Sequence, residues 1–344
     1  MSENTCSRNT ESSCTRKLNK KMEEESKSCW REEVKMMTSK EVWQLACQGR
    51  VRTLGKGAYG KAILVKDAGR MMVLKVANNR KTEDVSFQRE GEFLQLLQGA
   101  GGAPALYGVC QCPSALLMEY CEGDILCDLR QEFKTDRECL QVILATAKAL
   151  QQVHKKGLVH NDIKLDNIIV RRCQGVPQVR IIDYGMSRRV GTPQITFSGT
   201  HLEYFRSAPE MFVFGTTCSV ASDVYSFGVL VGDVHRQMRG YYPDLERLVV
   251  ESTRLTVADR LTLEAIIFTL EKLVRTLDSR RKVAAPAAVR GRRQVPPRPQ
   301  VPPRPQVFPT PQVLPKQHVA LCKQVPLQQQ VPHQQQVPHQ QQQV

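Results

Sequence analysis

The stretch that decides the fold is HNDIKLDN, residues 160–167. One short segment carries a carboxylate, an ammonium group and a carboxamide, on Asp162, Lys164 and Asn167. An apolar run follows at 168–170, and the triplet Asp-Tyr-Gly comes further along at 183–185. A proton acceptor, a cation and two oxygen ligands for hard metal ions are therefore expected close together.

A glycine-rich segment lies upstream, between two strand-like runs. Residues 54–60 read LGKGAYG and fit the spacing G-x-G-x-x-G. Glycines let the backbone approach a phosphate and direct its N–H groups toward it. Taken alone, the segment is better explained as a plain β-turn, so its meaning depends on the residues around it.

Lys75 lies inside the apolar strand-like run MMVLKVA at 71–77. A lysine in an apolar strand needs a partner for its charge. Glu90, in the helix predicted to follow, is the candidate partner. The alternative is an edge-strand lysine that faces solvent and leaves Glu90 as an ordinary surface charge.

In this order and spacing, the motifs resemble those of eukaryotic-type protein kinases over roughly residues 48–277. The resemblance implies that the glycine loop covers the phosphates of ATP, that Lys75 holds the α- and β-phosphates, and that Glu90 orients Lys75. Residues 118–121 resemble the hinge that binds adenine. The nucleotide-binding residues implied are Gly55, Lys56, Gly57, Ala58, Tyr59, Gly60, Ala62, Lys75, Met118, Glu119 and Cys121.

The resemblance also implies roles in catalysis. Asp162 is similar to the catalytic base, Lys164 to the lysine that steadies the γ-phosphate, and Asn167 and Asp183 to the metal ligands. The cofactors implied are ATP and Mg, with Mn as a second metal that suits the same ligands. Because Lys164 stands two residues after Asp162, as in serine/threonine kinases, the expected reaction is phosphoryl transfer to serine or threonine hydroxyls of protein substrates.

Strand patterns precede helix patterns along the chain, which indicates an α+β fold. We expect a bilobal protein-kinase-like architecture, with a small β-rich N-lobe and a larger α-helical C-lobe. The predicted organisation is a flexible polar arm at 1–45, a kinase domain at 46–278 and a disordered tail at 279–344.

The tail is rich in proline and glutamine and repeats every six residues from Gln294, with valine second in each unit. This composition is typical of polyproline II and of disorder rather than of a packed core. Residues 293–305 fit the patterns R-x-x-P-x-x-P and P-x-x-P-x-R, which SH3-type domains bind. A solvated spacer explains the same residues equally well.

The chain has 344 residues, a net charge of +15 and 12 cysteines. Ten lysines and arginines lie in the tail, where there is no acidic residue, so the charge does not indicate a nucleic-acid-binding domain. The cysteines lack metal-ligand spacing, and no apolar run is long enough to cross a membrane. We expect an intracellular monomer, cytoplasmic or nuclear, with reduced thiols.

Asn161 departs from the family pattern, since many kinases have arginine there. That arginine pairs with a phosphorylated activation-loop residue, which asparagine cannot do. The hypothesis is that activity does not depend on activation-loop phosphorylation. The alternative from another class is a pseudokinase or scaffold that binds nucleotide or partners without turnover, which would be expected to lack some of the catalytic residues.

Overall fold

The structure is a computed structural model that describes residues 34–57, 60–78, 81–130, 132–173, 176–195 and 205–284. Its first part is a six-stranded sheet in the order β1-β5-β6-β4-β3-β2, antiparallel except where β1 runs parallel to β5. These strands are β1 (Lys35–Met36), β2 (Arg50–Lys56), β3 (Gly60–Asp67), β4 (Arg70–Ala77), β5 (Leu106–Gln111) and β6 (Ser114–Glu119). Helix α2 (Ser39–Cys47) contacts β2, β3 and β4, and helix α3 (Lys81–Leu97) packs against β4, β5 and β6.

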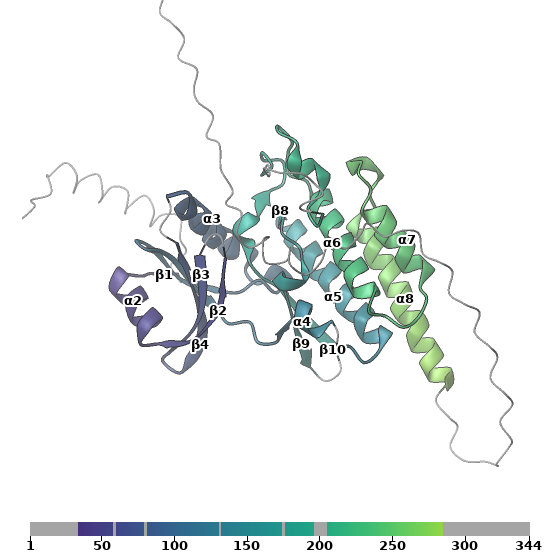
Figure 1. The fold of residues 1–344 in the computed structure, drawn as a ribbon, viewed down its shortest axis with the longest axis horizontal. Coiled ribbons are helices and arrows are strands. Elements are labelled where there is room, and N and C mark those ends of the chain that lie inside the picture. The colour runs from purple at the N-terminus through teal and green to yellow at the C-terminus, as the bar shows by residue number, and fades with distance from the viewer. Residues whose placement is uncertain are drawn as a thin grey trace, which may run out of the picture.

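The second part is mainly helical (Figure 1). Its helices are α4 (Leu126–Leu129), α5 (Asp136–Lys155), α6 (Val220–His235), α7 (Pro243–Ser252) and α8 (Leu263–Ala284). Its short strands are β7 (Asp124–Ile125), β8 (Leu158–Val159), β9 (Ile168–Cys173), β10 (Val176–Ile181) and β11 (Arg188–Arg189). The predicted α+β fold with a β-rich N-lobe and a helical C-lobe is therefore confirmed.

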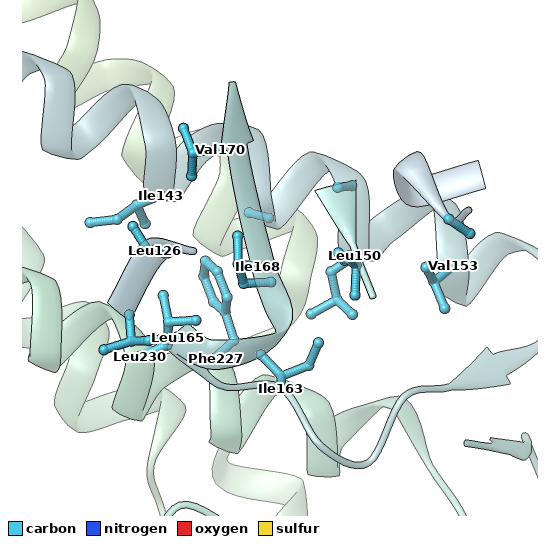
Figure 2. Packing of buried hydrophobic residues seen from close by; sticks show 14 of the residues in the cluster. Leu126, Ile143, Leu150, Val153, Ile163, Leu165, Ile168, Val170, Phe227 and Leu230 are labelled. Carbon is cyan, nitrogen blue, oxygen red and sulfur yellow. The ribbon is translucent and has the colours of Figure 1, made fainter. Parts of the chain in front are cut away.

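The segment that carries the catalytic motif is held by the core of the helical lobe. Ile163 and Leu165 point into the cluster that contains Leu150 of α5 and Phe227 of α6, as Figure 2 shows. All four side chains are buried. Because apolar and polar residues alternate here, burial of Ile163 and Leu165 turns the polar residues between and beside them toward the surface.

Residues 34–45, which the sequence prediction places in the N-terminal arm, contain strand β1 and most of helix α2. Helix α2 begins with a capping box, in which Thr38 and Glu41 each satisfy a backbone N–H of the other. Met37 and Val42 are buried in a cluster on one face of the sheet, together with Ile63 and other strand residues. The folded unit therefore includes this segment. Its strand and helix are short, so the periodic pattern of apolar residues in the sequence is weak.

The C-terminal boundary also differs from the prediction, because α8 continues past 278 to Ala284. The rest of the predicted arm and tail, including the SH3-type motifs at 293–305, lies outside the described residues. In the part of the chain that the structure covers, no helix has the length and apolar character needed to cross a membrane.

Shortening the chain to begin at residue 46 is expected to lower the free energy of unfolding by about 3–6 kcal/mol relative to a chain that begins at residue 34. The truncation removes two buried side chains, Met37 and Val42. The burial of each contributes about 1.5–3 kcal/mol to the free energy of unfolding. Thermal and denaturant unfolding of the two truncated chains measures the difference. Equal stabilities would show that α2 is a passive surface feature.

Candidate active site

Lys75 lies at the centre of the candidate site. Its Nζ is 2.9 and 2.6 Å from the two carboxylate oxygens of Glu90, and 2.9 Å from Oδ1 of Asp183. Strand β4 thus brings together a residue of helix α3 and a residue that follows strand β10. The sequence prediction that Glu90 is the partner of Lys75 agrees with this geometry, and the solvent-facing alternative does not.

Burial and charge act against each other at these three residues. Burial disfavours the ammonium charge of Lys75, but the carboxylates of Asp183 and Glu90 hold its pKa above the ordinary value. The ammonium group of Lys75 lowers the pKa of Asp183. Burial raises the pKa of Glu90, although Lys75 opposes that shift. The three groups are therefore mutually dependent, and Glu90 depends most on its partner because only 3% of its side chain is exposed.

Asp162 is the centre of a second set of contacts. Nζ of Lys164 lies 2.6 Å from its Oδ2, and the side-chain amide of Asn167 donates to the same oxygen at 2.9 Å and to the Asp162 carbonyl at 2.8 Å. The side chain of Asp162 is 29% exposed. Among the described residues, both side-chain donors to the Asp162 carboxylate bind Oδ2, and neither binds Oδ1.

The backbone before Asp162 is fixed by Asp223 of α6. One carboxylate oxygen of Asp223 accepts the N–H of His160 at 2.7 Å, and the other accepts the N–H of Asn161 at 2.8 Å. Asn161 has a φ of 64°, a left-handed conformation that costs energy in most residues but that asparagine adopts more readily. The side chain of Asp223 is fully buried and also lies 2.9 Å from Nε2 of His154. His154 is a supporting residue that sequence reasoning missed.

The three glycines of the loop at 55–60 meet different surroundings. A Cβ at Gly55 or Gly57 would have nothing within 4 Å, whereas one at Gly60 would lie 2.3 Å from the carbonyl oxygen of Val76. Gly60 is therefore required by the packing of β3 on β4, whereas the space beside Gly55 and Gly57 is open. Of the other residues predicted to bind the nucleotide, Lys56 ends strand β2, and Ala62 of β3 is paired with Lys75 of β4. Ala58 and Tyr59 lie outside the described residues.

The predicted hinge, residues 118–121, begins within the last two residues of strand β6 and continues past its end. Met118 and Cys121 are buried, and burial raises the pKa of the Cys121 thiol to about 11. The backbone N–H of Glu119 donates to the carbonyl of Ala105 at 2.8 Å, so that group is already engaged. A base bound at this hinge would need to use other backbone groups of 118–121.

The donor set fits a hard cation such as Mg²⁺. Asn167 uses its amide hydrogens for Asp162, which leaves its amide oxygen for a ligand, and the side chain of Asp183 is 48% exposed. Mg²⁺ typically takes one or two protein oxygens and completes its shell with water and phosphate. Consistent with such a small donor set, no group of three or more His, Cys, Asp or Glu residues suited to a metal occurs among the described residues.

The end of the activation segment is tied to the helical lobe by an ion pair. Arg260 donates from both terminal nitrogens to the two oxygens of Glu210, at 2.7 Å each. The guanidinium group also donates to the carbonyls of Ala221 and Arg254. This contact fixes the chain just before α6.

Tyr184 carries a hydroxyl group in an apolar position. Its side chain is fully buried, its ring lies edge-on to His160 at 4.9 Å, and burial raises its pKa. Among the described residues its hydroxyl has no hydrogen-bond partner. Such an unsatisfied donor costs free energy that a phenylalanine ring would not.

Replacing Tyr184 with phenylalanine is therefore expected to raise the free energy of unfolding by about 1–3 kcal/mol. The matched control is Tyr242→Phe, which removes a hydroxyl that lies 3.0 Å from Oδ2 of Asp136 and should lower stability. Thermal unfolding measures both. A fall in stability for Tyr184→Phe would indicate that its hydroxyl has a partner such as a buried water.

Comparison with known proteins agrees with this geometry. The family model for the protein kinase domain matches residues 49–258, so the chain belongs to the protein kinase family. It is similar to the serine/threonine-protein kinase SBK1 of Mus musculus, with 34% identity over 198 residues, 53% of this chain and 45% of that protein. SBK1 of Danio rerio is 32% identical over 194 residues, covering 53% of this chain and 49% of that protein.

A further relative is the eye isozyme of protein kinase C from Drosophila melanogaster, which is 30% identical over 210 residues. That match covers 57% of this chain and 29% of the fly protein. The chain thus aligns with less than half the length of each of these three relatives. The range that the family model matches, residues 49–258, contains Lys75, Glu90, Asp162 and Asp183.

Proposed function

We propose that this chain is an active protein kinase that transfers the γ-phosphoryl group of ATP to serine or threonine hydroxyls of proteins. The observation that carries the proposal is that Lys75 contacts Glu90 and Asp183 at the same time. One ammonium group thus links helix α3, the sheet and a proposed metal ligand in the arrangement that phosphate binding requires.

In this mechanism Asp162 accepts the hydroxyl proton of the substrate through Oδ1. Lys164 and Asn167 bind Oδ2 and so hold the carboxylate in one orientation. Lys75 binds the α- and β-phosphates, and Lys164 neutralises charge that develops on the transferred group. Asn167 and Asp183 would hold Mg²⁺, which supplies charge neutralisation between the phosphates when bound.

The test is an assay of the full chain with radiolabelled ATP, magnesium and basic and acidic carrier proteins. We expect label on serine or threonine, loss of transfer on chelation of the metal, and recovery when Mg²⁺ or Mn²⁺ is restored. Nucleotide binding without transfer under all these conditions would support the pseudokinase alternative and overturn the proposal. Label found only on tyrosine would overturn the substrate class.

The surroundings of Asn161 support activation without phosphorylation. Its side-chain oxygen accepts from Gln194 of the activation segment and from Ser222 of α6, at 3.3 Å each, and its amide nitrogen donates to the carbonyl of Met186 at 3.3 Å. All these partners are neutral. The activation segment is therefore anchored here by hydrogen bonds that need no phosphate.

Treating active enzyme with a phosphatase is accordingly expected to change the transfer rate by less than about twofold. Mass spectrometry before and after treatment verifies that phosphate was removed. The matched variant is Asn161→Arg, which removes the amide oxygen that accepts from Gln194 and Ser222 and is expected to lower activity. A large fall in rate after phosphatase would contradict the hypothesis for Asn161.

A further inference from the structure

A salt bridge links the hinge to the strand that leads to Asp183. Arg180, near the end of β10, donates from its two terminal nitrogens to the two carboxylate oxygens of Glu119, at 2.6 Å each. This two-point geometry is the strongest that an arginine and a carboxylate form. The side chains are 25% and 31% exposed, so solvent screens the pair only in part.

The same two side chains also bind the segment that follows helix α3. Nε of Arg180 donates to the carbonyl of Gly102 at 2.8 Å, and Glu119 accepts the N–H of Ala105 at 3.1 Å. There is no room for a side chain at Gly102, where a Cβ would lie 2.8 Å from the Cα of Arg180. The pair therefore joins three segments: the hinge, the segment between α3 and β5, and strand β10.

These three segments each lead to a part of the proposed nucleotide site. Glu119 belongs to the hinge, α3 carries Glu90, and β10 ends just before Asp183. The hinge would hold the base of ATP, while Asp183 would act at its phosphates. The distance between those two ends of one ligand depends on how β10 is held against the hinge.

We propose that Arg180 and Glu119 form a positioning pair that sets the spacing between the base and phosphate parts of the nucleotide site. This inference rests on the proposed function. The pair does not touch the reacting atoms; it acts through the backbone of the hinge and of β10. Its loss should therefore weaken ATP binding much more than it affects the protein acceptor or the chemical step. The Arg180 guanidinium lowers the pKa of Glu119, as expected of a pair charged at neutral pH.

The test is steady-state kinetics and direct ATP titration of Arg180→Met and Glu119→Gln in the full chain. We expect the KM and Kd for ATP to rise about tenfold in each, the scale of one charge-assisted contact. The KM for the protein acceptor should change less than about twofold and kcat less than about threefold. The double variant should be no worse than either single variant, since both remove one interaction.

Arg172→Met is the matched control, because Nε of Arg172 donates at 2.7 Å to Glu138 in a pair that joins β9 to α5 within the helical lobe. It should leave the KM for ATP unchanged. Arg180→Lys, which keeps the charge but not the two-point geometry, should give an intermediate ATP affinity and serves if Arg180→Met fails to fold. Thermal unfolding identifies such a failure.

An unchanged KM and Kd for ATP in folded Arg180→Met or Arg180→Lys would overturn the inference and leave the pair a purely structural contact. Equal increases in the KM for ATP and for the acceptor would overturn it as well. These results are distinct from failure of the proposed function, in which the unmodified chain would show no transfer at all.

Discussion

Replacing Lys75 with methionine is expected to lower phosphoryl transfer by a factor on the order of 10³, at or below the detection limit of most assays. Among the residues that the structure describes, Lys75 is the only cation in a salt bridge with Glu90 or with Asp183, and the variant removes it. The phosphates of ATP would lose the cation proposed to bind them, and the carboxylate of Asp183 loses a partner 2.9 Å away. Asp183→Ala is expected to abolish transfer as well, because it removes a proposed metal ligand.

Stability and catalysis can be separated in this variant. Lys75→Met leaves Glu90 as a buried carboxylate without its partner, which should destabilise the domain and raise the pKa of Glu90 further. Adding Glu90→Gln removes that charge, so the double variant should recover stability but not activity. Lys66→Met, on the exposed end of β3, is the matched control and should keep both.

Thermal unfolding and the radiolabel assay measure these outcomes. Turnover retained in Lys75→Met would rule out the assigned role of Lys75. Activity restored together with stability in the double variant would show that the loss came from misfolding rather than from chemistry.

The sequence indicated the candidate catalytic side chains better than the elements that support them. The proposed roles of Asp162, Asn167 and Asp183 rest on the resemblance to kinase motifs, in which each chemical role demands one residue type at one place. Glu90 was a choice between a partner and a surface charge, and burial in the folded state settles it. A motif carries this information because the reaction restricts the residues independently of the surrounding packing.

The supporting contacts have no comparable local pattern. Arg180 and Glu119 are 61 residues apart in the sequence, and neither stands in a motif that indicates the other. The hairpin of β9 and β10 was not predicted, since Arg171, Arg172 and Pro177 interrupt its apolar alternation. Helix α7 and the segment at 34–47 are short, so their stability comes from tertiary packing and only weakly from local sequence.

Replacing Asp223 with alanine is expected to lower the free energy of unfolding by about 2–5 kcal/mol and to reduce transfer on the order of 10²-fold. The change leaves the N–H groups of His160 and Asn161 buried without acceptors, and His154 loses its carboxylate partner. Asn161, which has a left-handed backbone conformation, would lose the hydrogen bond from its N–H to Asp223 that stabilises this conformation. Asp162 would sample orientations in which Oδ1 no longer faces the substrate.

Asp223→Asn should have a smaller effect, because it keeps one acceptor oxygen for a backbone N–H. Asp244→Ala is the matched control; this carboxylate lies on α7 and makes a solvent-exposed contact with Lys272 at 3.5 Å, so its loss should change stability by less than about 0.5 kcal/mol. Hydrogen exchange at the amides of His160 and Asn161 should accelerate in Asp223→Ala before the domain unfolds globally. Slow exchange at both amides, with full transfer activity, would show that the loop keeps its conformation without the Asp223 carboxylate. Asp223 would then have no part in positioning Asp162.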